Sequence, residues 1–253
     1  RCRKGQLTRP TVAITFDDGY QHTFSTAFPI LEELQLPATV FLSSGLIGSE
    51  RTIWYFHLLS TLQASSQRMI SWYGRRYHLS TADEKASALR HWIQKLKSMP
   101  HHCLLQELTN LLQILGGSFD QLLPDDSPFL MLNVKSIAAM TASGLIEFGG
   151  HTRDHTILSR LTPQQQEYQI AESIRSIETI TGKPCLTFAY PNGRRQDYNQ
   201  TTIDIVSNYG IEQAVTTIKG CNRPTTSALE LRRIGVGGSW NMDLFRIVLH
   251  SPF

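Results

Sequence analysis

The stretch AITFDDG, residues 13–19, decides the fold of this chain. It completes an apolar, β-branched segment that begins at Thr11 and stops at two adjacent carboxylates and a glycine. This pattern predicts a buried strand followed by a tight turn. Gly19 supplies the backbone freedom that such a turn needs. Two like charges side by side raise each other's pKa unless a positive group stands near them. We therefore expect a basic side chain from elsewhere in the sequence to pair with Asp17 or Asp18.

Strand and helix patterns alternate along most of the remaining sequence. Short apolar runs predict further strands at 38–42, 145–148, 185–190, 214–217 and 233–236. Apolar residues at helical spacing, with capping residues and glycines at the ends, predict helices at 24–34, 133–144, 163–182, 203–209 and 242–249. Repeated β-α units of this length favour an α/β fold with a parallel sheet, either a barrel or a doubly wound arrangement.

The alternation is interrupted from about residue 51 to residue 132, where leucine-rich helical patterns dominate. They run from Ala86 to Leu96 and from Leu104 to Leu115. We interpret this stretch as a helical insertion or lid. It belongs to one domain that spans residues 1–253 and does not form a separate domain.

The composition excludes several classes of protein. The 253 residues carry 24 basic and 21 acidic side chains, and a net charge of +3 is too weak and too scattered to indicate a nucleic-acid partner. No apolar run approaches the roughly 18 residues of a membrane-spanning helix. Four cysteines without a CxxC pair do not indicate a structural zinc cluster. The numbering starts at Arg1, so a signal peptide could precede it, and the compartment and oligomeric state stay open.

A second polar cluster, HTRDH at 151–155, follows the end of a predicted strand. Histidines four residues apart share one face of a helical turn, so both imidazoles can reach one ion. Two histidines and one carboxylate, with a position left open for water, are a common catalytic arrangement around a divalent metal. We expect such a site here, although either motif alone is also compatible with a solvated turn or a surface histidine.

A third cluster, FAYPNG at 188–193, also lies at a strand end. Its Pro-Asn-Gly turn can present the backbone N–H of Asn192 to a developing oxyanion. The carboxyl ends of parallel strands meet at one rim, where α/β sheets and barrels place their active sites. The sequence therefore predicts that all three clusters form one site.

Three motifs, TFDDG at 15–19, HTRDH at 151–155 and YPNG at 190–193, resemble the first three motifs of the polysaccharide deacetylases. These are the NodB-homology enzymes of carbohydrate esterase family 4. The resemblance implies a distorted (β/α) barrel and hydrolysis of acetyl groups from a sugar polymer, usually at N-acetylglucosamine. It also implies that Asp17 is the general base and that Asp18, His151 and His155 bind zinc or a similar divalent ion.

The sequence departs from that family in its third, fourth and last motifs. The family's third motif commonly carries an arginine at the position of Ala189, so either Arg232 or Arg233 is the candidate partner of Asp17, unless these form only a surface salt bridge. The family's last motif supplies a histidine acid, for which His250 is the candidate. Residues 241–249 also fit an amphipathic helix, which would make His250 an ordinary terminal residue. The family's fourth motif has no counterpart that we recognise.

Tyr190, Pro191 and Trp240 are the residues expected to contact substrate, and Trp54, Tyr55 and Trp72 either stack on sugars or belong to the core. By family analogy the substrate is an exopolysaccharide or cell-wall glycan rich in N-acetylglucosamine. One alternative is a catalytically impaired glycan-binding module on the same fold. A phosphoryl-transfer enzyme is a weaker alternative, because the phosphatase motif separates its two carboxylates by one residue.

Overall fold

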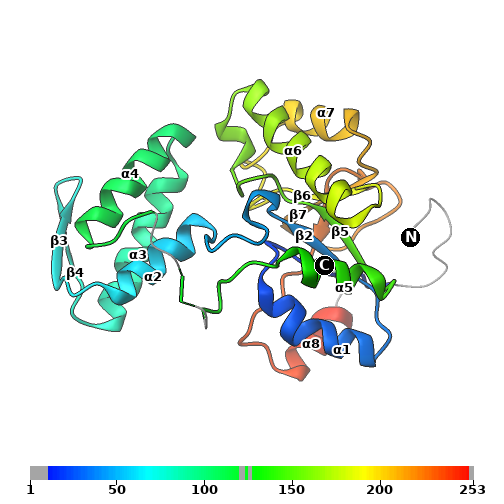
Figure 1. Ribbon diagram of the computed structural model, residues 1–253, viewed down its shortest axis with the longest axis horizontal. Coiled ribbons are helices and arrows are strands. Elements are labelled where there is room, and N and C mark those ends of the chain that lie inside the picture. The colour runs from blue at the N-terminus through cyan, green and yellow to red at the C-terminus, as the bar shows by residue number, and fades with distance from the viewer. Residues whose placement is uncertain (1–10, 120–122, 125–126, 251–253) are drawn as a thin grey trace.

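A computed structural model describes residues 11–119, 123–124 and 127–250 of the chain. Its main sheet has six strands in the order β1-β2-β5-β6-β7-β8, and every neighbouring pair is parallel. The sheet curls into part of a barrel with helices around it, as expected for a distorted (β/α) barrel (Figure 1). The strands are β1 (Ile14–Phe16), β2 (Ala38–Leu42), β5 (Ile146–Gly150), β6 (Thr187–Ala189), β7 (Gln213–Lys219) and β8 (Leu231–Arg233).

The helices of this part begin and end where their capping residues predict. Asn133 accepts a hydrogen bond from the backbone of Ser136 at the start of α5, and Thr162 forms a capping box with Gln165 at the start of α6. Gly182 ends α6 in the left-handed conformation. The helices are α1 (Phe28–Glu33), which follows a π-helical turn over 23–27, α5 (Val134–Ala142), α6 (Pro163–Thr181), α7 (Gln200–Asn208) and α8 (Met242–His250).

The core lies between the sheet and these helices. Val40 and Phe188 are fully buried from the sheet side. Ile170, Ile174 and Ile177 form the buried stripe of α6, since residues at this spacing share one helix face. This burial holds the carboxyl ends of the strands in a fixed relation to one another.

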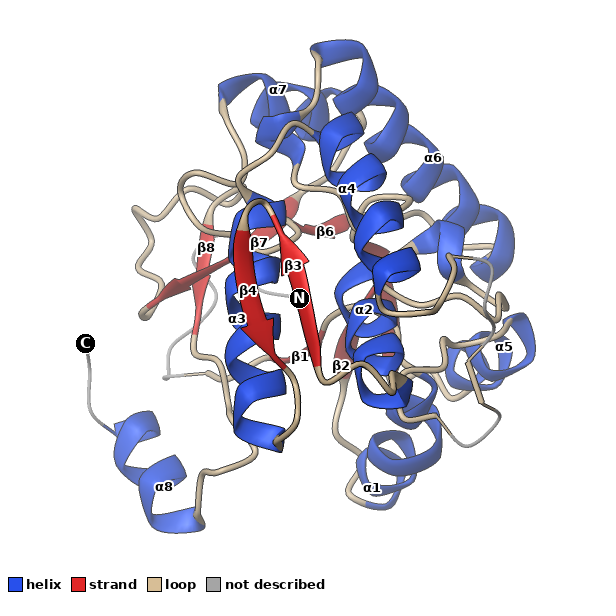
Figure 2. Cartoon of the chain, turned by 90° about the vertical axis from the view of Figure 1, so that its left-hand side faces the viewer, coloured by secondary structure: helices blue, strands red, loops and turns tan. Residues whose placement is uncertain are grey.

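Residues 54–115 form a second body of structure with its own hydrophobic cluster, to the left of the sheet in Figure 1. The predicted helices are present, but the sequence analysis missed a hairpin between them, seen in front in Figure 2. Tyr73 and Gly74 connect its strands, both with positive φ, as two-residue hairpin turns require. The elements are α2 (Trp54–Ala64), β3 (Met69–Trp72), β4 (Arg75–His78), α3 (Ala82–Lys97) and α4 (His101–Ile114).

The predicted limits of the insertion, 51–132, include residues 120–122 and 125–126, which lie outside the described part. These limits and the single-domain assignment stay predictions. No helix in the described ranges is long and apolar enough to cross a membrane.

Candidate active site

The three polar clusters follow β1, β5 and β6 at the same end of the parallel sheet. Residue pairing aligns the last residues of neighbouring strands, with Leu42 opposite Gly150 and Gly150 opposite Phe188. The carboxylates after Phe16, the histidines after Gly150 and the turn after Ala189 therefore start from one rim. The predicted convergence is confirmed.

A tight turn directs the two carboxylates after β1. Asp18 and Gly19 have φ angles of 75° and 86°, and the N–H of Gly19 donates to the carbonyl of Asp17 at 2.9 Å. A Cβ atom on Gly19 would lie 2.8 Å from Cδ2 of Leu42, so no other residue fits without movement. The turn lets adjacent side chains serve one site, which a continuing strand could not do.

The histidine segment is irregular, and the prediction of a helical turn is wrong. Thr152 and His155 have φ angles of 62° and 52°, outside the helical region. Gln169 of α6 holds this loop by hydrogen bonds: its carbonyl accepts from the N–H of Arg153, and its side chain both accepts from the N–H of Asp154 and donates to the Asp154 carboxylate. Side-chain hydrogen bonds thus replace the helical pattern.

Asp18, His151 and His155 bring three donor atoms to one point. Nε2 of each histidine lies 3.2 Å from Oδ1 of Asp18. One ligand atom from each residue lies within 4.8 Å of the others. The imidazoles are almost completely buried, whereas 17% of the Asp18 side chain is exposed. The cluster is therefore closed on the protein side and reachable from solvent on the other.

Hydrogen bonding and burial shift the protonation of these three groups in different directions. Burial would lower the pKa of His151, but its hydrogen bond to Asp18 and the charges of Asp17 and Asp18 outweigh burial and raise it. Nδ1 of His151 lies 2.7 Å from the carbonyl of Ala189; its N–H donates there and leaves Nε2 with a free lone pair. Burial would raise the pKa of Asp18, but His155 and His151 hold it well below its ordinary value. Burial lowers the pKa of His155 and favours neutral imidazole, although Asp18 opposes this effect.

Arg233 is the positive partner of Asp17. Its two terminal nitrogens donate to the two carboxylate oxygens at 2.6 and 2.7 Å, and its Nε donates to the carbonyl of Thr216 at 2.8 Å. Burial would raise the pKa of Asp17, but the hydrogen bonds and charge of Arg233, together with the charge of His151, outweigh burial and hold the pKa below its ordinary value. Arg232 is exposed, and its backbone pairs with Asn222. Of the two predicted candidates, the structure selects Arg233.

Comparison with known proteins agrees with this geometry. A family model described as polysaccharide deacetylase matches residues 4–95 and 117–214, well over half of the chain. The chain belongs to the polysaccharide deacetylase family. The Bacillus subtilis (strain 168) protein "Putative polysaccharide deacetylase YxkH" is 22% identical over 240 residues, 95% of this chain. The chain spans only 56% of that relative's length.

Two solved structures share the fold. The Streptococcus pyogenes deacetylase PplD, in complex with acetate, superposes with a TM-score of 0.60 at 18% identity, covering 97% of this chain and 74% of PplD. IcaB from Ammonifex degensii gives a TM-score of 0.58 at 21% identity, covering 98% of this chain and 77% of IcaB. At these identities the likeness concerns the fold alone.

The donor set of this chain fits a divalent metal ion. Two imidazole nitrogens and one carboxylate oxygen, with one open side, suit zinc and similar ions. The Ala189 carbonyl orients His151 in the way that outer partners orient metal ligands in proteins. Ala189 thus contributes its backbone where the family commonly has an arginine side chain.

The third motif is only partly as predicted. Tyr190 is completely buried, stacks on Tyr198 with ring centres 4.3 Å apart and donates its O–H to the carbonyl of Leu229 at 2.9 Å. Its predicted contact with substrate is wrong, because the side chain points into the core. Pro191 is also buried, so its predicted contact with substrate is wrong as well. Asn192 has φ of 59° and is partly exposed, and its oxyanion role stays a prediction.

The C-terminal candidates do not join the site. His250 lies on the last turn of α8, exposed, with Nδ1 2.8 Å from the carbonyl of Arg246. Trp240 precedes α8 and packs near Gly237. No contact found within 11–119, 123–124 and 127–250 links either side chain to Asp17 or Asp18. Residues 242–250 are a helix, as the amphipathic interpretation predicts, and α8 stands apart from the sheet in Figure 2.

Two residues of the second body, Lys97 and Tyr55, reach the site, and the sequence analysis missed Lys97. Lys97, on the last turn of α3, donates a hydrogen bond from Nζ to Oδ1 of Asn192. Its Nζ also lies 5.2 Å from the centre of the Tyr55 ring, and that ring packs edge-on against His155. A lysine near a helix C-terminus is ordinary in sequence, so no signal marks Lys97.

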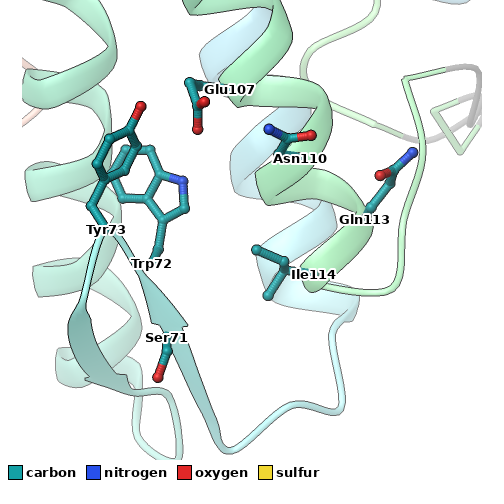
Figure 3. A pocket seen from close by; sticks show the side chains of 7 residues that line it. All are labelled: Ser71, Trp72, Tyr73, Glu107, Asn110, Gln113 and Ile114. Atoms are coloured by element: carbon teal, nitrogen blue, oxygen red, sulfur yellow. The ribbon is translucent and has the colours of Figure 1, made fainter.

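An open cavity of about 670 Å³ lies away from this site, between the β3–β4 hairpin and α4. Figure 3 shows Trp72 and Tyr73 on the hairpin facing Glu107 and Asn110 on the helix. The alternative role of Trp72 in the core is confirmed, since its side chain is 4% exposed.

Proposed function

We propose that this chain is a metal-dependent hydrolase that removes acetyl groups from N-acetylglucosamine residues of an exopolysaccharide or cell-wall glycan. Membership of the polysaccharide deacetylase family supports the reaction class. The observation that carries the proposal is a cluster of three metal-donor side chains with a separate carboxylate next to it. The cluster is Asp18, His151 and His155, and the carboxylate is that of Asp17, which stays outside the cluster.

The chain's own residues divide the chemistry between them. A divalent ion, for which we propose zinc, polarises the acetyl carbonyl and acidifies the attacking water when it is bound. Asp17 takes the proton from that water as general base. Arg233 fixes the direction of the carboxylate, whose oxygens keep lone pairs beyond the two hydrogen bonds. The backbone N–H of Asn192 donates to the oxyanion that develops on the acetyl oxygen.

The rival function, a glycan-binding module without activity, rested on the missing arginine of the third motif and on the unassigned acid. Arg233 supplies the equivalent charge from another strand, with two hydrogen bonds to the carboxylate. This pairing favours the hydrolase over the impaired module.

The test is acetate release from N-acetylated chito-oligomers, measured with and without a chelator, with acetylated xylan as a second substrate. We expect chelator-sensitive release from the chito-oligomers that exceeds release from xylan. Binding of the oligomers without acetate release, at any added metal, would support the glycan-binding module and overturn the hydrolase. Faster release from xylan would instead assign the enzyme to O-acetyl groups.

A further inference from the structure

The site as described lacks a group that protonates the leaving amine. His151 and His155 turn their Nε2 atoms to Asp18, and an arginine such as Arg233 does not release its proton. Burial raises the pKa of Tyr55 far above its ordinary value, which makes it a poor acid. His250 lies on α8, outside the contacts of the site. Lys97 is the remaining proton donor at the rim.

We propose that Lys97 is the general acid of this enzyme, supplied by the second body and not by the barrel. This inference rests on the proposed hydrolase function. Lys97 Nζ donates to the side chain of Asn192, the residue whose backbone N–H is assigned to the oxyanion. An ammonium has three N–H donors, so two remain for a substrate. The oxyanion and the leaving nitrogen sit on the same carbon, so a donor beside Asn192 is within reach of both.

The charged surroundings of Lys97 suit an acid. Burial lowers the pKa of Lys97, Arg194 adds to this effect, and Asp197 and Asp18 oppose it. His155 also feels the charge of Lys97, and the Tyr55 ring lies under its Nζ. An ammonium whose pKa moves down toward the working pH gives up its proton more readily, as an acid must.

Lys97 lies outside the residues that the family model matches. The family model matches residues 4–95 and 117–214, so Lys97 and α4 fall in the stretch that it leaves out. Asp17 is held from β8 by Arg233, whereas Lys97 approaches from α3. Base and acid thus reach the rim from two different parts of the chain.

The proposed step balances as follows. The bond between the tetrahedral carbon and nitrogen breaks, and its electron pair stays on nitrogen. That nitrogen takes a proton from Nζ of Lys97, which gives acetic acid, the free amine of the sugar and a neutral lysine. The acetic acid then loses its hydroxyl proton to solvent and becomes acetate. The proton that Asp17 took from water leaves to solvent, and Lys97 regains one from solvent before the next turnover.

The experiment compares Lys97→Met, Lys97→Arg and the control Lys95→Met on two substrates. Lys95 lies on the same turn of α3 as Lys97, but its Nζ lies over the ring of Tyr73 in the β3–β4 hairpin and not beside Asn192. One substrate is the N-acetylated chito-oligomer, and the other is 4-nitrophenyl acetate, whose leaving group departs without a proton. Metal content and the urea midpoint of each variant are measured alongside.

With Lys97→Met and Lys97→Arg, we expect kcat on the chito-oligomer to fall by about 10²–10⁴-fold. Turnover of the aryl ester, metal content and stability should stay close to those of the unaltered protein. The alkaline limb of the kcat profile, where Lys97 loses its proton, should disappear, and Lys95→Met should change nothing.

Three outcomes would overturn the inference. Activity retained by Lys97→Arg would make the role electrostatic, because a guanidinium keeps the charge but holds its proton. Equal losses on both substrates would make Lys97 a positioning residue for Asn192. Unchanged chito-oligomer turnover in Lys97→Met would exclude any role. Failure of the unaltered protein to release acetate from either substrate is a different result, since it would reject the proposed function itself.

Discussion

Arg233 and Asp17 join the two edges of the main sheet. The two residues are 216 positions apart in the chain. Asp17 directly follows β1, the first strand in the sheet order, and Arg233 lies on β8, the last. The guanidinium spans the edges with hydrogen bonds to Asp17 and Thr15 on one side and to the Thr216 carbonyl on the other. One side chain thus ties the curled sheet together and orients the carboxylate proposed as the base.

Replacing Arg233 by Met is expected to move the acid limb of kcat/KM to higher pH. Asp17 must be ionised to accept a proton, and Arg233 holds its pKa below the ordinary value. Without the guanidinium the pKa rises, and activity at neutral pH should fall by about 10²-fold or more. A pH–rate profile measures this, with the exposed Arg232→Met as control. An unshifted limb in Arg233→Met would exclude the coupling.

The same ion pair makes stability depend on pH. Because the folded pKa of Asp17 lies below its unfolded value, the pair stabilises the fold at pH above the unfolded value. That contribution is lost as the pH falls through the lower, folded value. We expect the gap in urea stability between the unaltered protein and Arg233→Met to narrow between neutral pH and about pH 3. A constant gap would contradict this account.

Substitutions at the two carboxylates should separate metal binding from turnover. Asp18→Ala and His155→Ala remove a donor atom from the cluster, so bound metal is expected to be lost. Asp17→Asn keeps shape and leaves the cluster intact, so the metal should stay while kcat falls by about 10²–10⁴-fold. Metal analysis after desalting, with acetate release on the same samples, measures both. Equal metal and equal rate in all three variants would refute the assigned roles.

Gln169→Leu is expected to weaken metal binding without touching a ligand. Gln169 holds the backbone of Arg153 and Asp154, between the two histidines, and such supporting groups are worth about 10–100-fold in metal affinity. The control is Gln164→Leu, an exposed position on the same helix. Competition with a fluorescent chelator gives the affinities, and matching values for the two variants would exclude a supporting role.

Gly19→Ala should destabilise the fold more than Gly144→Ala. Both glycines have positive φ, at 86° and 72°, which costs an L-residue about 1–2 kcal/mol. Only at Gly19 would the added Cβ also press against Leu42, at 2.8 Å, whereas nothing lies within 4 Å at Gly144. Urea unfolding of both variants isolates the steric part, and equal losses would mean that Leu42 moves aside freely.

Periodicity and capping allowed most of the barrel to be predicted from sequence. The strand at 38–42 and the helix with its capping box at Thr162 have the predicted ends, because local patterns and burial agree there. The convergence of Asp18, His151 and His155 was also predictable, since strand ends in a parallel sheet share one rim.

What sequence reasoning missed depends on contacts between distant residues. The loop from His151 to His155 takes its shape from Gln169, so spacing alone suggested the wrong local conformation. Tyr190 was expected in the cleft, but its neighbour Tyr198 and the Leu229 carbonyl hold it inside. Lys97 reaches Asn192 only because the second body packs beside the barrel, and no local pattern records that packing.

The link between Arg233 and Asp17 also has a consequence for biosynthesis. The three donor residues for the ion are all synthesised by the time His155 leaves the ribosome, whereas the partner of the base is made much later, near the last strand. A nascent or prematurely terminated polypeptide that ends before Arg233 therefore contains Asp18, His151 and His155, but its Asp17 has no arginine to orient the carboxylate. Under the proposed function, hydrolysis would therefore require that β8 has been synthesised and has paired with β7 in the sheet.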